Sequence, residues 1–333
     1  MKPYAINQDR FPAGLDRELM GLFYDLPLNP CPWASVAQAV GRPVEVILEG
    51  LRTGLERGTF QFCRGLFNSP RLGYQSTLLA AQVPTDRVDA TARIVSDSLF
   101  VSHNFLRAGS ELNLWFTLTC PRKGPGLDDV VREMTQTLSL PLRRFDAVRH
   151  YKISFQSLFP RRTVPNDQPD DSNLPEPAPE VLVRAVDILQ QDLPLVERPF
   201  LNRELPEHEL LHAARCLRRR GVLRRLGVVW NLEKMTDFQN LLCLWDLPEP
   251  RLEPFARAVA EHPRVSHCYQ RMRLPDWPWS LYTVFHGRSR DDGLAWVRET
   301  TANFPEARSL PLWTVREYKQ SPIHYDPDKI VLG

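Results

Sequence analysis

The fold is decided by a six-residue stretch that occurs twice. Residues 102–107 read SHNFLR and residues 266–271 read SHCYQR, so a Ser-His pair, an aromatic residue and an arginine return at matched positions 164 residues apart. A period this long is not that of a solenoid, whose repeats span roughly 20–50 residues. The chain therefore holds two diverged copies of one unit. We expect the copies to pack against each other and to form an asymmetric site.

The composition predicts an ordinary globular protein of the cytoplasm. The 333 residues are 43% hydrophobic and 25% charged, with a net charge of +2. No apolar run approaches transmembrane length, and residues 1–10 lack the apolar core of a signal peptide. Six cysteines without a Cys-x-x-Cys pair predict buried thiols rather than disulfides or a zinc site: Cys31, Cys63, Cys120, Cys216, Cys243 and Cys268.

A segment rich in proline and acidic residues, 161–179, separates the copies and is predicted to be an extended linker. We call residues 1–160 copy one and residues 180–333 copy two. Each copy divides again. The helical spacing predicts winged helix-turn-helix domains at 1–67 and 180–232, and the remaining residues predict ferredoxin-like βαββαβ domains at 68–160 and 233–333. The predicted class is α+β, a tandem duplication of this domain pair.

This domain pair resembles the leucine-responsive (Lrp/AsnC) regulators, which dimerise through their ferredoxin-like sheets. The resemblance implies that the two copies form that dimer within one chain. Fusion would raise their effective concentration and enforce the pairing of unlike copies.

The charge pattern argues against sequence-specific DNA binding. The N-terminal residues of a reading helix should contact bases. The reading helix of copy one is net negative, and the first turn of that of copy two carries Glu207 and Glu209. The charges in copy one are Glu45, Glu49 and Glu56 against Arg52 and Arg57. The basic residues come later, at a helix end and wing. They either complement the helix dipole or face an anionic ligand between the halves: Arg215, Arg218, Arg219, Arg220, Arg224 and Arg225.

The repeated stretch supplies the candidate site. Residues two apart on a strand share a face, so Val101, His103, Phe105 and Arg107 are expected on one face, as are their counterparts Val265, His267, Tyr269 and Arg271. An imidazole can ligate iron or transfer a proton near neutral pH. A guanidinium forms paired hydrogen bonds with carboxylates. An aromatic ring supplies a flat apolar wall.

Catalytic signatures of other classes are missing. The sequence has no Walker loop, Gly-x-Gly-x-x-Gly, His-Glu-x-x-His or Gly-x-Ser-x-Gly. We therefore expect no bound nucleotide, no metal held by the protein and no resident cofactor. The residues suit a flat, carboxylate-rich ligand that carries its own metal.

Further motifs make the chain similar to the siroheme decarboxylases of haem d1 biosynthesis, with a D-type copy one and an L-type copy two. The resemblance rests on residues 73–81, 101–105 and 113–118 in copy one, and on 224–229, 266–271, 274–279, 285–288 and 316–319 in copy two. Trp230 and Asn231 depart from the pattern, since L-type chains often carry Arg-His there.

The resemblance implies loss of CO2 from two acetate side chains of siroheme, giving 12,18-didecarboxysiroheme, with the iron carried by the substrate. Related enzymes serve an alternative haem pathway, so both roles stay open. Partners implied are siroheme, the internal pseudo-dimer, and a second copy or separate G- and H-type chains; DNA and membranes are not expected. The rival interpretations are an Lrp-type regulator that senses tetrapyrroles and a haem carrier.

The candidate residues follow from the repeat and the resemblance together. Copy two is preferred as the reacting copy because it carries two of the histidines. The expected catalytic residues are His267, His286 and His103; the expected substrate contacts are Arg107, Arg271, Tyr269, Trp277, Trp115, Arg225 and Lys319.

Overall fold

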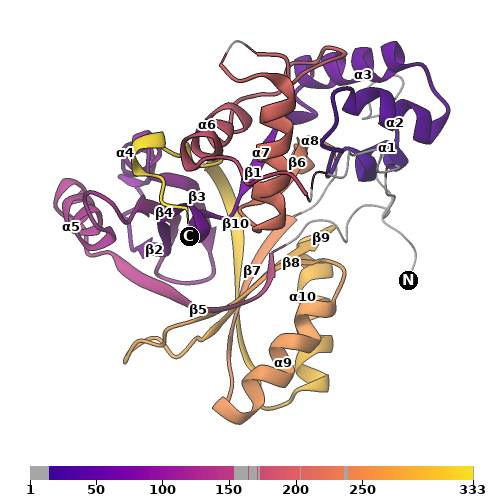
Figure 1. The fold of residues 1–333 in the computed structure, drawn as a ribbon. Helices are drawn as coiled ribbons and strands as arrows, with labels where there is room; N and C mark the ends of the chain where they lie inside the picture. Colours follow the sequence, from indigo (N-terminus) through magenta and orange to yellow (C-terminus); the bar gives the residue numbers. More distant parts are fainter. Residues whose placement is uncertain are drawn as a thin grey trace. The chain divides into compact units, whose positions relative to one another are not determined.

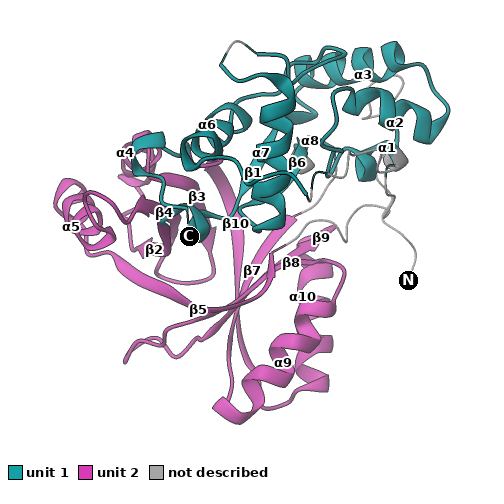
Figure 2. Ribbon diagram, in the orientation of Figure 1, with its two compact units in different colours: residues 1–73, 159–236, 324–333 teal, residues 74–158, 237–323 magenta. Residues whose placement is uncertain are grey.

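The structure is a computed structural model that describes residues 15–153, 164, 171, 173–202, 204–235 and 239–332. The chain is shown in Figure 1. It separates into two compact units, coloured in Figure 2. Unit 1 comprises residues 1–73, 159–236 and 324–333, and unit 2 comprises residues 74–158 and 237–323. Each unit therefore draws on both halves of the sequence.

Unit 2 contains the ferredoxin-like order twice, as the sequence predicted. The structure confirms the α+β duplication. In copy one the elements are β2 (Tyr74–Ala81), α4 (Val88–Asp97), β3 (Val101–Ala108), β4 (Leu114–Pro121), α5 (Leu127–Leu138) and β5 (Arg143–Ile153). In copy two they are β7 (Gln239–Asp246), α9 (Glu249–Glu261), β8 (Val265–Arg271), β9 (Leu281–Gly287), α10 (Arg290–Asn303) and β10 (Arg308–Gln320). The sequence pattern predicts the last strand of copy one at 147–155; the observed β5 begins earlier, at Arg143, and 154–155 lie outside the described residues.

The helices of unit 2 follow from their amphipathic pattern, as α5 shows. Leu127, Val130, Met134 and Leu138 recur every three or four residues and are all buried. The first turn carries two aspartates, which favour the positive end of the helix dipole. The spacing of the apolar residues predicts a helix over 127–138, which is the observed range.

The strands of unit 2 form one closed barrel in the order β10-β3-β4-β2-β5-β8-β9-β7. Two junctions join the copies: the last strand of copy one, β5, pairs with β8 of copy two, and the last strand of copy two, β10, pairs with β3 of copy one. Closure leaves no exposed sheet edge. The first residues of each last strand pair within their own copy, β5 with β2 and β10 with β7, and the later residues cross to the other copy. We call β5 and β10 the exchanged strands, and this crossing forms the predicted internal pseudo-dimer.

Each exchanged strand is anchored to a helix of the other copy by a lysine. The Lys152 ammonium on β5 donates to the carbonyl of His262, just after α9, at 3.0 Å. The Lys319 ammonium on β10 donates to the carbonyl of Ser96 in α4 at 2.7 Å. A cation at a helix C-terminus satisfies carbonyls that have no partner within the helix. The two contacts are pseudo-symmetric, so they hold both junctions in the same way.

The barrel has separate cores on its outer and inner faces. The outer face of each copy packs against its own two helices, around Phe116 and Val95 in copy one and around Phe285 and Trp296 in copy two. The inner core draws on both copies and is mostly aromatic and aliphatic: Ala80, Trp115, Phe145, Leu242, Leu244, Tyr282 and Leu312.

A β-bulge beside the repeated stretch changes which residues share a face. The predicted grouping of Val101 with His103, and of Val265 with His267, is therefore wrong. The register of β3 against β4 shifts between Val101 and His103, and that of β8 against β9 shifts between Val265 and His267. Both valines consequently lie in the helix-side cores, away from the histidines. A bulge inserts an extra residue and so breaks the strict alternation that the sequence argument used.

Unit 1 contains the helical portions of both copies. Copy one contributes α1 (Arg17–Leu22), α2 (Pro32–Val40), α3 (Val44–Glu56), β1 (Phe60–Phe67) and η2 (Ser69–Leu72); copy two contributes α6 (Pro179–Leu189), α7 (Glu207–Arg219), β6 (Leu223–Trp230), α8 (Leu232–Met235) and η4 (Pro327–Lys329). The expected wing strands, β1 and β6, pair with each other in an antiparallel two-stranded sheet.

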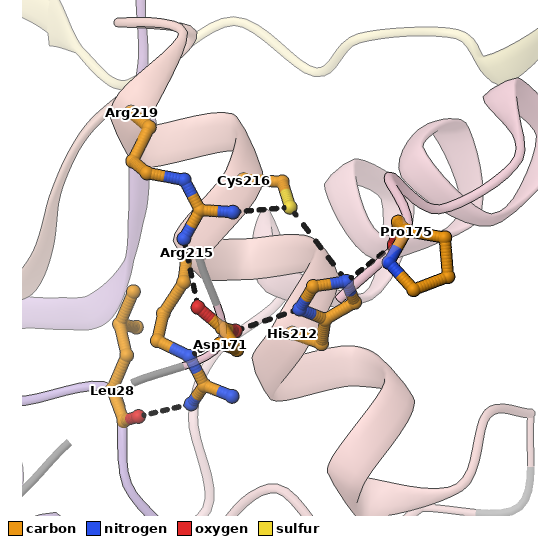
Figure 3. Close-up of polar contacts among 7 residues, drawn as sticks. All are labelled: Leu28, Asp171, Pro175, His212, Arg215, Cys216 and Arg219. Carbon is orange, nitrogen blue, oxygen red and sulfur yellow. Dashed lines mark hydrogen bonds and ion pairs between the residues drawn. The ribbon is translucent and has the colours of Figure 1, made fainter. Parts of the chain in front are cut away.

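Much of the basic cluster of copy two is used inside unit 1. Figure 3 shows that the carboxylate of Asp171, from the predicted linker, meets three cationic or imidazole side chains of α7. It lies 2.6 Å from His212 Nδ1, 2.7 Å from Arg215 Nε and 2.8 Å from Arg219 Nη1. Arg215 also donates to the carbonyl of Leu28 at 2.9 Å. The cluster thus ties Asp171 to α7.

The charge of Asp171 is strongly stabilised. Burial favours its protonated form, but hydrogen bonds from His212, Arg215 and Arg219 outweigh burial and hold the pKa of this carboxyl well below its ordinary value. A carboxyl with a lowered pKa in the folded state stabilises the protein above its unfolded-state pKa. That stabilisation is lost as the pH falls through the folded-state pKa.

We predict that Asp171→Asn lowers the free energy of unfolding by about 3–5 kcal/mol at pH 7, because Arg215 would remain buried without its carboxylate. Urea titrations at pH 7 and pH 4 measure this effect. The loss should be almost as large at pH 4, because that pH still lies above the ordinary carboxyl pKa of 3.8. Asp192→Asn is the control, since Asp192 pairs with Arg64 at 2.9 Å but is 63% exposed. That control should cost at most about 1 kcal/mol. Equal losses in the two variants would contradict the prediction.

Candidate active site

The histidines of the repeated stretch face the barrel interior. Their neighbours face the helices: the Asn104 amide donates to the carbonyl of Ala92 in α4 at 2.9 Å, and the Cys268 thiol donates to the carbonyl of Ala256 in α9 at 3.7 Å. Since side chains alternate along a strand, His103 and His267 lie on the opposite face. The two arginines of the stretch share that face.

We define the copy-two cluster as His150, Ser266, His267, Tyr269, Arg271 and His286. Its centre is the hydroxyl of Ser266, which lies 2.8 Å from Nδ1 of His267 and 2.7 Å from Nε2 of His286. A hydroxyl can donate one hydrogen bond and accept another. The structure therefore brings together two of the three predicted catalytic histidines through a group that can pass a proton between them.

His286 is the buried end of this chain of hydrogen bonds, which runs from His267 through Ser266. It is 3% exposed, and burial lowers its pKa to about 4. The imidazole is accordingly neutral at pH 7. An anion placed beside it would favour the protonated form and raise the pKa again.

Arg271 is a half-buried cation within the same cluster. One Nη donates to the carbonyl of Phe145 at 2.6 Å, and the guanidinium lies over the rings of Tyr269 and Tyr282, 5.2 and 5.4 Å from their centroids. Burial lowers its pKa. Within the part of the chain that the structure describes, its buried Nε has no hydrogen-bond acceptor. This N–H is thus suited to a ligand carboxylate.

His150 reaches the copy-two cluster from copy one. It lies on the exchanged strand β5, opposite Tyr269. Its ring meets Tyr269 edge-on at 5.0 Å, while the ring of His267 lies nearly parallel to Tyr269 at 5.8 Å. The copy-two cluster is therefore built by both copies.

The predicted tryptophans join the inner core beside this cluster. Trp115 of copy one lies 6.1 Å from Trp277 of copy two, and Phe145 contacts both at 5.6 and 5.7 Å. Trp277 Nε1 donates to the hydroxyl of Tyr282 at 3.0 Å. These rings form an apolar wall next to Arg271.

We define the copy-one cluster as Ser102, His103, Phe105, Arg107, Thr119 and Glu317. His103 Nδ1 lies 2.8 Å from the hydroxyl of Ser102. Burial, and then the charge of Arg107, lower the pKa of His103 to about 4. Arg107 donates to the hydroxyl of Thr314 at 2.9 Å and lies over the ring of Phe105 at 4.9 Å. This third predicted catalytic histidine belongs to a separate cluster.

Two predicted substrate contacts are engaged elsewhere. Arg225 lies in unit 1, where it donates to the carbonyl of Tyr24 at 2.7 Å and stacks over that ring at 4.2 Å. Lys319 pairs with Asn104, which faces the helices, and its ammonium serves the end of α4. Neither side chain is brought to a histidine of the clusters by these contacts.

Two members of the copy-two cluster, Ser266 and His150, were not predicted from the sequence. Ser266 is part of the repeated stretch, but nothing in the sequence shows that its hydroxyl joins two imidazoles. His150 lies in residues 149–152, RHYK, which return 167 residues later as REYK at 316–319. That second repeat could have marked β5 and β10 as equivalent strands.

The arrangement can bind a flat anion and move a proton. It combines a half-buried guanidinium, a histidine–serine–histidine chain and an aromatic wall. No group of three or more His, Cys, Asp or Glu side chains that could hold a metal occurs among the residues that the structure describes. None of the described helices is long and apolar enough to cross a membrane.

Comparisons with known proteins match both copies of the chain. A model of the AsnC-like ligand binding domain matches residues 71–152 and 237–319, once in each copy. The siroheme decarboxylase NirDL subunit of Paracoccus pantotrophus is 33% identical over 316 residues, covering 91% of this chain and 94% of that protein. The siroheme decarboxylase of Hydrogenobacter thermophilus is 30% identical, covering 93% and 94%.

A solved structure is also similar along nearly the whole chain. The siroheme decarboxylase NirDL in complex with an iron-uroporphyrin III analogue has a TM-score of 0.71 and 29% identity, with 94% of each chain covered. The resemblance expected from the motifs is thereby confirmed. The chain belongs to the siroheme decarboxylase family.

Proposed function

We propose that the chain removes CO2 from two acetate side chains of siroheme, without oxidation, to give 12,18-didecarboxysiroheme. The observation that carries the proposal is the Ser266-linked pair His267 and His286 beside Arg271, whose Nε is buried, in a member of this family. Siroheme is flat, bears iron and has eight carboxylates, so it matches the aromatic wall and the cation of Arg271. The iron belongs to the substrate, and we propose no resident cofactor.

The chemistry requires a proton at a defined carbon atom. The bond between the acetate methylene and its carboxylate breaks, CO2 leaves, and the electron pair stays on the methylene carbon. Protonation of that carbon gives a methyl group, so the reaction is redox-neutral. His267 is proposed as the donor, with Ser266 and His286 resupplying the proton.

Arg271 and the aromatic wall would favour the step in different ways. Arg271 holds a carboxylate of the substrate and so fixes its orientation. The apolar surroundings of Trp115 and Trp277 exclude water from the reacting carboxylate, which favours its conversion into neutral CO2. These roles need only residues of unit 2.

We also propose how the chain assembles and in which compartment it acts. The internal pseudo-dimer supplies both copies of the ferredoxin-like domain to one site, and we propose that the protein acts in the cytoplasm. We propose that the chain associates either with a second copy of itself or with separate G- and H-type chains. Service to haem d1 biosynthesis is favoured by the fused D- and L-type organisation of the relatives.

The decisive experiment is anaerobic incubation with siroheme, followed by mass spectrometry. We expect the stepwise loss of two CO2 units. Siroheme that binds unchanged would instead support a carrier or sensor.

We predict that His267→Ala and His286→Ala each lower turnover by about 100-fold or more while siroheme still binds, because they remove the proton path but leave the arginine. Arg271→Ala should chiefly weaken binding, by roughly 1.5–3 kcal/mol. Turnover by mass spectrometry and binding by absorbance measure the two effects. Full turnover in both histidine variants, together with its abolition by His103→Ala, would assign the reaction to copy one.

Siroheme binding at pH 7 should take up protons. The pKa of His286 is about 4 in the free protein, and substrate carboxylates would raise it toward neutrality. Affinity should therefore weaken as the pH rises through the pKa of the bound state. Calorimetry in buffers of different ionisation enthalpy measures the uptake. His286→Gln should reduce it, whereas His324→Gln, at an exposed position in unit 1, should not.

If the chain were instead a transcription regulator, unit 1 would have to bind DNA. A regulator requires sequence-specific DNA binding, but Glu207 at the start of α7 is ion-paired with Arg198. Arg215 and Arg219 are bonded to Asp171. We predict only weak, salt-sensitive and non-specific DNA binding in a mobility-shift assay. Sequence-specific binding with a nanomolar dissociation constant at physiological salt would favour the regulator.

A further inference from the structure

The copy-one and copy-two clusters occupy equivalent positions but differ in charge. Glu317 lies opposite Phe105 in the pairing of β10 with β3, where His150 lies opposite Tyr269 in the pairing of β5 with β8. At the position where β9 carries His286, β4 carries Thr119: both backbone N–H groups donate across to the residue that precedes the paired strand, Phe100 or Arg264. Two imidazoles in one cluster are thus replaced by a carboxylate and a hydroxyl in the other.

The carboxylate of Glu317 acts on the arginine of its own cluster. Burial lowers the pKa of Arg107 to about 10, and the charge of Glu317 opposes that shift. The protein therefore supplies a negative charge beside Arg107. The carboxylate that acts on Arg271, Asp146, is already bonded to Arg144 at 2.8 Å.

The second replacement, Thr119 in place of His286, removes one imidazole from the path that could carry a proton. The hydroxyl of Thr119 lies 2.8 Å from that of Ser76. The copy-one cluster therefore has a hydroxyl pair where the copy-two cluster has His286 joined to Ser266. Ser102 contacts one imidazole, that of His103.

We infer that Glu317 keeps the copy-one cluster from binding a polycarboxylate, so that each chain holds one siroheme, at the copy-two cluster. The inference rests on the proposed function and defines its stoichiometry. A carboxylate facing an anionic ligand opposes binding by like-charge repulsion. His150, at the equivalent position, brings no negative charge and has a ring N–H that can donate to an anion.

The test is a titration of the full-length protein with the iron-uroporphyrin III analogue, followed by absorbance. The wild-type chain should bind one equivalent. Glu317→His combined with Thr119→His makes the copy-one cluster resemble the copy-two cluster and should give two equivalents. The converse pair, His150→Glu with His286→Thr, should weaken binding of the single equivalent roughly 100-fold or more.

Glu317→Gln covers the case in which a double variant does not fold. It keeps the side-chain shape, removes the charge, and should strengthen binding of a second equivalent about 10-fold or more over the wild type. Glu133→Gln, at an exposed position on α5, is the matched control and should leave one equivalent. Circular dichroism verifies folding.

The outcomes separate the inference from the proposed function. Two equivalents in the wild type, or a single equivalent with no second phase in both Glu317 variants, would overturn the role of Glu317 and leave the decarboxylase proposal intact. A wild-type chain that binds no analogue would contradict the proposed function and, with it, the inference.

Discussion

The barrel of unit 2 depends on one constraint, the exchange of the last strands between the copies. Without β5, the copy-two sheet would end at β8, and without β10 the copy-one sheet would end at β3. Either edge would expose unpaired backbone groups. The inner core would also lose its partners, since Trp115 and Phe145 come from one copy and Tyr282 and Leu312 from the other. Neither ferredoxin-like domain can bury its inner face alone.

Fusion makes this mutual dependence compatible with divergence. A symmetric homodimer must place the same residue at both junctions, because one sequence supplies both strands. Here His150 and Glu317 occupy equivalent positions on different strands and can differ. The chain can therefore keep the cations and imidazoles of one cluster while the other changes. The backbone framework, with its matching bulges and lysine contacts, remains the same in both.

The sequence was sufficient for the fold and for part of the site. Repeats of the 102–107 stretch identified the duplication, and the spacing of apolar residues located helices such as α5. Alternation placed His103 and Arg107 on one face but misplaced Val101, because an inserted bulge residue leaves no mark in a pattern of alternating polarity. Which of these residues act in the reaction stays a prediction.

The missing parts depend on contacts made over long distances in the chain. His150 joins Tyr269 only because β5 crosses to the other copy. Arg225 and Lys319 were predicted to contact the substrate. In the structure both donate to backbone carbonyls, which any residue can provide. Asp171 lies in a segment whose composition predicts no order, but three side chains of one helix bind it. Local composition does not reveal such partners.

The exchanged strands also explain how the site can change without loss of the barrel. A second pair of bulges, between His150 and Lys152 and between Glu317 and Lys319, shifts the register of both strands. In a regular strand, residues two apart would share a face. The bulge instead lets Lys152 reach the helix side while His150 lies against Tyr269 on the inner face. One strand therefore fastens the copies on one face and delivers a site residue on the other, so selection can alter position 150 or 317 while the lysine contact that joins the copies persists.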